Sequence, residues 1–123
     1  MRILKAAIPL LLALAAPLAA RAQPAPAVQE EIKYLLSYIE NSGCEFYRNG
    51  SWSDAKTAQG HMRTKYNFLV GRDHVATVSD FIDKAASESS MTGTPYQVRC
   101  GQKPPVLSRV WLGEELARHQ GPR

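Results

Sequence analysis

The sequence is poor in cysteine and lacks the short motifs that mark common hydrolases and metal sites. Two of its 123 residues are cysteines and three are histidines. G-x-S-x-G is absent, and with it the strained turn that exposes a hydrolase serine. H-E-x-x-H and Asp-rich calcium loops are absent too, and the histidines fall on separate predicted elements. We therefore expect no cofactor and no metal site, and the sequence by itself names no reaction.

Long apolar runs are missing except at the amino terminus. There Arg2 and Lys5 precede an apolar run over residues 6–18, and the small-residue site Ala20-Arg21-Ala22 follows. This pattern is typical of a secretory signal peptide cleaved after Ala22. The run is shorter than the roughly 20 residues that cross a bilayer, and no cysteine follows for lipid attachment. We expect an exported, periplasmic chain without a membrane span after cleavage.

An excess of charge is also missing once the signal peptide is removed. The whole chain has 15 basic and 11 acidic residues, but Arg2, Lys5 and Arg21 lie in the signal peptide, which leaves 12 against 11. A nearly neutral domain lacks the basic patch that nucleic acids require, so no nucleic acid is expected as a partner. The remaining residues, about 100, suit one domain. We predict a flexible Pro/Ala leader over 23–27, a single domain over 28–119 and a disordered tail over 120–123.

The two cysteines, Cys44 and Cys100, both lie in the exported part of the chain. Oxidising compartments favour disulfides, and two cysteines supply only half of the ligands of a structural zinc site. We therefore predict a Cys44–Cys100 disulfide.

Local signals divide the domain into helices and short strands. The first helix is predicted over residues 28–43, and Asn49-Gly50 then forms a strong hairpin signal. Ser53 is a good N-cap for a second helix that ends near Gly71. Thr77 and Asp80 resemble a capping box that opens a third helix, which we expect to continue through Ser90. YQVRC, residues 96–100, alternates as a strand, and Ser108 is expected to cap a final helix.

The predicted order is helix, hairpin, helix, helix, strand, helix, which defines an α+β fold. We expect about four helices packed on a small antiparallel sheet of two or three strands, with one disulfide. If Cys44 and Cys100 face each other on neighbouring antiparallel strands, Phe46 faces Val98 and Arg48 faces Tyr96. This register places an arginine and a tyrosine together at the end of the ladder, on the core-facing side.

Two further basic side chains are predicted to reach the same corner. His61 and Lys65 are four residues apart, at the boundary of the apolar stripe of the second helix, and can point along it toward the sheet. Hydroxyl groups after the third helix add hydrogen-bond donors. The candidate ligand-binding residues are Arg48, His61, Lys65, Ser87, Ser90, Thr92 and Tyr96. Such a set suits a carboxylate, a phosphate or a sugar, although solvated charges and helix-end contacts explain the same residues.

Two catalytic interpretations receive little support. Ser53-Asp54-Ala55-Lys56 matches S-x-x-K, but the other motifs of penicillin-recognising enzymes are absent and the chain is too short for that fold. His61 could be combined with Ser87, Ser89 or Ser90 as a hydrolase pair, but no activating motif accompanies them. We therefore expect a protein that is not an enzyme.

Three segments carry a resemblance to a known family: FYRNG at 46–50, AQGHMRTKY at 58–66 and DFIDKAASESSMTGTPYQV at 80–98. They resemble the YfeK-like family of small exported bacterial proteins of unknown function. The resemblance implies a bacterial periplasmic setting and gives no activity, substrate or cofactor. Its pattern falls on Arg48, Asn49, Gly50, His61, Lys65, Phe81, Ile82, Ser87, Ser89, Ser90, Gly93, Pro95 and Tyr96, while both cysteines lie outside it.

These observations favour a binding or interaction module for an anionic or polyhydroxylated ligand. A structural interaction domain, in which the polar residues of the pattern form a hydrogen-bonded core, is the alternative, and a small Ser/His hydrolase is a third. A small anionic molecule and an envelope protein are the two classes of partner that these hypotheses leave open.

Overall fold

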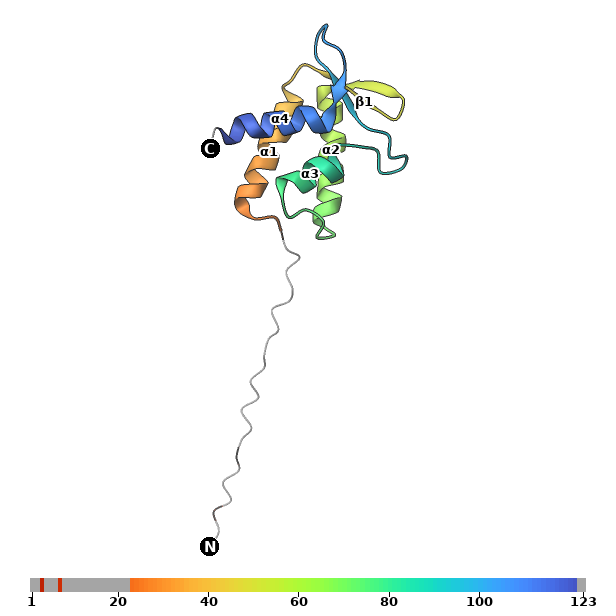
Figure 1. Cartoon of the computed structure of the whole chain (residues 1–123). Helices are drawn as coiled ribbons and strands as arrows, with labels where there is room; N and C mark the ends of the chain where they lie inside the picture. The colour runs from red at the N-terminus through yellow and green to blue at the C-terminus, as the bar shows by residue number, and fades with distance from the viewer. Residues whose placement is uncertain (1–2, 4–6, 8–22, 122–123) are drawn as a thin grey trace.

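The computed structural model describes residues 3, 7 and 23–121 (Figure 1). The predicted signal peptide, except for positions 3 and 7, and the last two residues of the predicted tail lie outside the described residues. Its elements are α1 (Pro26–Glu40), β1 (Glu45–Arg48), β2 (Ser51–Asp54), α2 (Ala55–Val70), α3 (Val78–Ala85), β3 (Gln97–Arg99), β4 (Val106–Leu107) and α4 (Ser108–Gln120). The predicted α+β fold is confirmed, and the predicted elements appear in the expected order with one further strand, β4. Within residues 23–121, no helix has the length and apolar character needed to cross a membrane.

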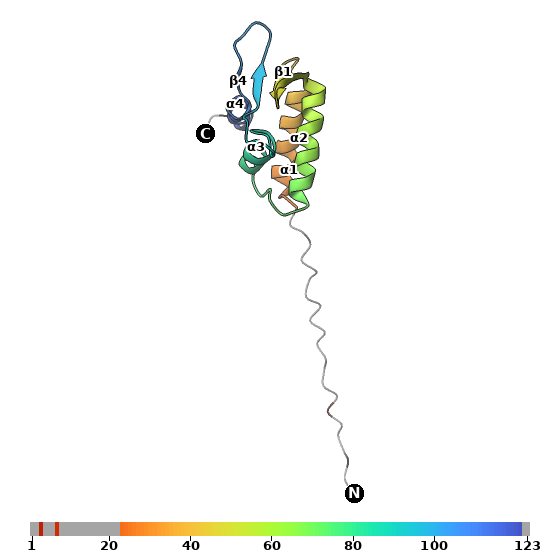
Figure 2. The same cartoon turned by 90° about the vertical axis from the view of Figure 1, so that its right-hand side faces the viewer.

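The sheet is antiparallel and has four strands in the order β2-β1-β3-β4. The sheet has more than the expected two or three strands, because residues 106–107, just after the two prolines, form an additional strand. Val106 pairs with Val98, and Leu107 pairs with Gln97. The strands gather at one end of the helices, α1 and α2 lie side by side, and α3 and α4 pack on the same side of that pair (Figures 1 and 2).

The hairpin and the disulfide establish the predicted register. Asn49 and Gly50 have φ values of 48° and 88°, as a two-residue hairpin turn requires. Cys44 and Cys100 form the predicted disulfide. Phe46 pairs with Val98, as expected. Both side chains are buried in the core, and Trp111 of α4 packs edge-on against the Phe46 ring, with 5.6 Å between ring centroids.

The beginnings of α1 and α2 differ from the prediction. Pro26 occupies the first turn of α1, where a missing N–H is harmless, so the last two residues of the predicted leader are helical. The helix α4 also runs to Gln120, one residue beyond the predicted domain end. Ser53 does not cap α2, because β2 continues to Asp54. The Asp54 carboxylate instead accepts a hydrogen bond of 2.7 Å from the backbone N–H of Thr57.

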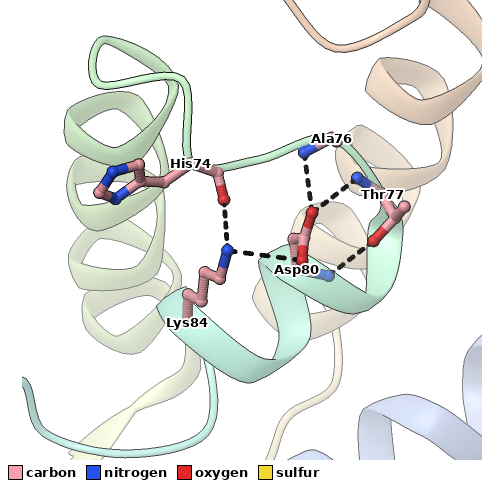
Figure 3. A network of polar contacts seen from close by, with 5 residues as sticks. All are labelled: His74, Ala76, Thr77, Asp80 and Lys84. Atoms are coloured by element: carbon pink, nitrogen blue, oxygen red, sulfur yellow. Dashed lines mark hydrogen bonds and ion pairs between the residues drawn. The ribbon is translucent and has the colours of Figure 1, made fainter.

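The capping box at the start of α3 is confirmed (Figure 3). The Asp80 carboxylate accepts hydrogen bonds from the backbone N–H groups of Ala76 and Thr77, at 2.9 and 3.1 Å, while the Asp80 N–H donates to the Thr77 hydroxyl at 3.0 Å. Lys84 lies 3.5 Å from the same carboxylate and donates to the carbonyl oxygen of His74. Local contacts therefore define this helix start.

The end of α3 differs from the prediction, because the helix stops at Ala85 and does not continue through Ser90. Residues 87–96 fold back on themselves as a loop. The Tyr96 N–H donates to the Ser87 carbonyl at 2.9 Å, and the Ser89 N–H donates to the Thr94 carbonyl at 3.0 Å. These cross-loop bonds replace the helical ones. The predicted left-handed conformation of Gly93 is present, with φ of 71°.

Ser108 is the first residue of α4 and does not cap it. Its hydroxyl is fully buried and has no hydrogen-bond partner, whereas its backbone N–H donates to the Tyr96 carbonyl at 2.9 Å. The pairing of β4 with β3 places this residue inside the domain, which is why a serine that is typical of an N-cap does not act as one here.

Candidate functional site

A groove lies where the middle of α2 meets the ends of β1 and β3. Its volume is about 320 Å³, and its walls are Arg48, His61, Thr64, Lys65, Phe68 and Tyr96. The structure therefore brings together four of the seven candidate residues. Arg48 belongs to β1, His61 and Lys65 belong to α2, and Tyr96 directly precedes β3. We call this feature the basic groove.

Lys65 is held in place by the loop that follows α3. Its ammonium group donates to the carbonyl oxygen of Glu88 at 2.6 Å and to the Tyr96 hydroxyl at 3.3 Å. It also lies 5.1 Å from the centre of the Tyr96 ring. Tyr96 is itself buried. The loop after α3, the residue that precedes β3 and the helix α2 therefore meet at Lys65, at the edge of the groove.

Arg48 is exposed at the end of β1, although the predicted register placed it opposite Tyr96 on the core-facing side. The prediction was wrong in this respect because the pairing of β1 with β3 ends at Tyr47 and Gln97. The ion pairs of the described residues join other side chains: Lys84 with Asp80, Arg99 with Glu45, and Arg118 with Glu115. No acidic residue is among those that line the basic groove. The Arg48 guanidinium therefore faces this groove without a carboxylate to neutralise it.

The electrostatic environment of His61 fits this arrangement. Burial, and second the positive charge of Arg48, hold the pKa of the His61 imidazole below its ordinary value of 6.5. At neutral pH the ring is therefore uncharged, with one nitrogen that donates a hydrogen bond and one that accepts. The positive charge of the groove then comes from Arg48 and Lys65.

A small apolar pocket opens behind the basic groove. It is lined by Phe46, Tyr47, Arg48, Ser53, Ala58, His61, Met62 and Tyr96, and its volume is about 10 Å³. Arg48, His61 and Tyr96 line both spaces. This volume holds about one water molecule or methyl group, so the Arg48 wall of the groove stands next to a small apolar pocket.

Thr64 and Phe68 were missed as groove residues. The signal was present, because residues 61, 64, 65 and 68 follow the i, i+3, i+4, i+7 spacing of one helix face. This second stripe lies beside the apolar stripe that contains Met62 and Tyr66.

The remaining three candidates lie outside the groove walls. Ser87 is buried and donates its hydroxyl to the carbonyl oxygen of Ile82. Thr92 is exposed, and its hydroxyl contacts the side chain of Asn49 at 3.3 Å and that of Thr94 at 3.0 Å. Ser90 is exposed in the same loop. Two of these three hydroxyls therefore hold the loop in its conformation.

No group of three His, Cys, Asp or Glu side chains gathers closely enough to hold a metal ion in the part of the chain that the structure describes. The serines that could be combined with His61, at positions 87, 89 and 90, line neither the basic groove nor the pocket behind it.

The folded region coincides with the extent of a known family. A family model described as a family of unknown function, DUF5329, matches residues 26–120, from the first residue of α1 to the last of α4. The chain belongs to this family. Among curated proteins, the uncharacterised protein YfeK of Salmonella typhimurium is similar, with 37% identity over 62 residues. That match covers half of each chain, so this DUF5329 member spans about half the length of its curated relative. No solved structure matches it.

The resemblance to YfeK-like proteins that the sequence indicated is thereby confirmed. Membership in DUF5329 assigns no activity, because the function of the family is unknown.

Proposed function

We propose that this protein is a non-enzymatic binding module whose basic groove takes a small anionic ligand. One observation carries the proposal: the exposed, unpaired Arg48 and the tethered Lys65 line a groove with no acidic wall. A guanidinium offers paired N–H donors that match the two oxygens of a carboxylate or phosphate. His61, uncharged at neutral pH, adds a hydrogen bond without adding charge.

The exposure of the groove determines how such binding would behave. Charges in contact with water are screened by salt, so affinity should be modest and should fall as ionic strength rises. Lys65 already contacts Glu88 and Tyr96, so Arg48 is the side chain with free donors. It should therefore contribute most to the binding of an anion.

The test is a titration with phenyl phosphate at low ionic strength, followed by two-dimensional NMR of the amide groups. We expect shifts around Arg48, His61, Lys65 and Tyr96, and at least a tenfold loss of affinity in Arg48→Gln. Arg109→Gln is the matched control, because Arg109 is also exposed but lies on α4, away from the groove walls. Equal losses in both variants, or shifts elsewhere on the domain, would contradict the proposal.

A structural role is favoured for the serines of the loop. Ser87 and Ser89 are buried, and the Ser89 hydroxyl accepts hydrogen bonds from the backbone N–H groups of Met91 and Thr92 at 3.2 and 3.4 Å. Ser89→Ala should therefore lower the free energy of unfolding by about 1–3 kcal/mol, whereas Arg48→Gln should change it by less than about 0.5 kcal/mol. Urea denaturation of both variants separates the structural residues from the ligand-binding ones.

We also propose that the protein resides in the bacterial periplasm. The Cys44–Cys100 disulfide supports this location, because such bonds persist in oxidising compartments. The predicted signal peptide supports it independently. Fractionation of cells that express the full chain, with detection of a form shortened at Ala22, tests the location. A full-length chain that stays in the cytosol with free thiols would refute it.

A further inference from the structure

The walls of the basic groove are more apolar than an ion-binding site requires. Phe68 is 57% exposed, although it belongs to a helix whose other exposed positions are mostly polar. Arg72, one turn on, lies 4.4 Å from the centre of this ring. Phe68 and the buried Tyr96 both line the groove. The groove therefore offers an apolar wall beside its cations.

The small pocket extends this apolar surface inward. Phe46, Ala58 and Met62 line it, and all three are buried core residues. Because Arg48 and His61 line both spaces, a ligand whose anionic end contacts Arg48 would have apolar surface on both sides of that contact. One methyl-sized group fits the pocket, and a larger apolar part would lie along Phe68.

Hydroxyl-rich ligands fit these walls less well. Thr64 supplies the one aliphatic hydroxyl among the residues that line the groove, and the Tyr96 hydroxyl, which accepts a hydrogen bond from Lys65, has a single O–H left to donate. Ser87 and Thr92, which would have added donors, bond within the protein. A ligand hydroxyl that leaves water without a partner weakens binding. The groove therefore offers a sugar few side-chain hydroxyls, whereas its apolar wall favours a ligand that carries an apolar part.

We infer that the ligand of the basic groove is an amphipathic organic anion, a carboxylate or phosphate ester that carries an apolar chain or ring. This inference rests on the proposed anion site and adds the class of ligand. The head group contacts Arg48, and the apolar part contacts Phe68 and the pocket behind the groove. A polyhydroxylated ligand, which the sequence left open, is the less favoured class.

Isothermal titration calorimetry with matched probes tests the inference at pH 7 and constant ionic strength. The probes are acetate, gluconate, hexanoate and benzoate, with benzamide as a neutral analogue of benzoate. Each methylene group that leaves water tightens binding about fourfold. We therefore expect hexanoate and benzoate to bind at least tenfold more tightly than acetate and gluconate, and benzamide to bind at least tenfold more weakly than benzoate.

Two variants separate the apolar contribution from the ionic one. Phe68→Ser should weaken benzoate at least fivefold and leave acetate unchanged, and Arg48→Gln should weaken every anion. Val110→Ser is the control for Phe68, because Val110 is an exposed apolar residue on α4 that does not line the groove. The fold should survive all three changes, because these side chains are exposed.

The possible failures are distinguishable. If acetate and gluconate bind as tightly as benzoate, and Arg48→Gln weakens them all, the anion site stands and the amphipathic ligand is refuted. If no anion binds, or if benzamide equals benzoate, the proposed anion site fails as well. If Val110→Ser has the effect expected of Phe68→Ser, the apolar contact lies elsewhere and the inference is overturned.

Discussion

Breaking the Cys44–Cys100 disulfide should lower the free energy of unfolding by about 4 kcal/mol. The two cysteines are 56 residues apart in the sequence, and a cross-link that closes a loop of this length removes about 14 cal/mol/K of entropy from the unfolded chain. At 25 °C this corresponds to about 4 kcal/mol, a large part of the 5–15 kcal/mol that is usual for a domain. The reduced protein should therefore be folded but only marginally stable.

The assay compares the oxidised and reduced forms of the unmutated protein by urea denaturation, monitored by far-ultraviolet circular dichroism. Reduction keeps both sulfur atoms in place, so the comparison measures loop closure rather than lost packing. With the usual urea dependence of 1–3 kcal/mol per molar, the midpoint should fall by roughly 1–4 M. A Cys44→Ala, Cys100→Ala double variant should lose at least as much, since Cys44 is buried.

A decrease of less than about 1 kcal/mol, with an unchanged urea dependence, would refute this reasoning. It would mean that the unfolded chain is already confined without the cross-link. The groove supplies a second measurement. Phe46 and Val98 pair between β1 and β3 and are both buried in the core, so the reduced protein at low temperature should keep this packing and bind phenyl phosphate with an affinity within a few fold of the oxidised form.

Three further predictions concern single residues. Asp80→Ala should lower the free energy of unfolding by about 1–2 kcal/mol, while the exposed Asp83→Ala on the same helix should change it by less than about 0.5 kcal/mol; urea denaturation measures both. The pKa of His61 is lowered in the folded protein by burial and by Arg48, so the unfolded chain binds this proton at a higher pH than the folded protein does. The free energy of unfolding should therefore fall as the pH drops through 6.5. In a titration from pH 8 to 5, His61→Gln should reduce this dependence of stability on pH. Ser108→Ala should not reduce the melting temperature, since the buried hydroxyl has no hydrogen-bond partner to lose. A decrease of about 1 kcal/mol in the free energy of unfolding would instead indicate that the Ser108 hydroxyl caps α4.

Asp80, the acidic residue of the capping box, makes stability depend on pH in a lower range than His61 does. Hydrogen bonds from the backbone, that of Ala76 first, lower the pKa of the Asp80 carboxyl in the folded protein. The stabilising effect of this carboxylate is therefore complete above the pKa of an unfolded aspartate. It is lost as the pH falls through the lower folded value, so it does not overlap with the effect of His61.

Several features followed from the sequence because they depend on short-range interactions or on strand geometry. Asn49-Gly50 predicts the turn through the backbone preferences of two residues, and Thr77 with Asp80 predicts the start of α3 through contacts within one turn. The disulfide and the period of two along a strand then place Phe46 opposite Val98. Each of these predictions is confirmed by the structure.

Other features could not be read from the sequence, because they depend on segments far apart in the chain. The pairing of Val106 and Leu107 with β3 turns the expected cap Ser108 into a buried residue. The end of α3 at Ala85 is decided by cross-loop hydrogen bonds that Ser89 and Tyr96 make. A helical pattern in residues 77–90 cannot reveal such competing partners.

The candidate site also has features that the sequence predicted and features that only the tertiary structure determined. The register and the helix spacing by themselves predicted that Arg48, His61, Lys65 and Tyr96 would meet, because parity along strands and the rise of a helix are properties of the backbone. Only the tertiary structure decided which hydroxyls face the groove, that Lys65 is tethered to the loop at Glu88, and that Phe68 forms an apolar wall. These outcomes depend on which surfaces remain uncovered after the helices, the sheet and the loop have packed together, and no local pattern carries that information.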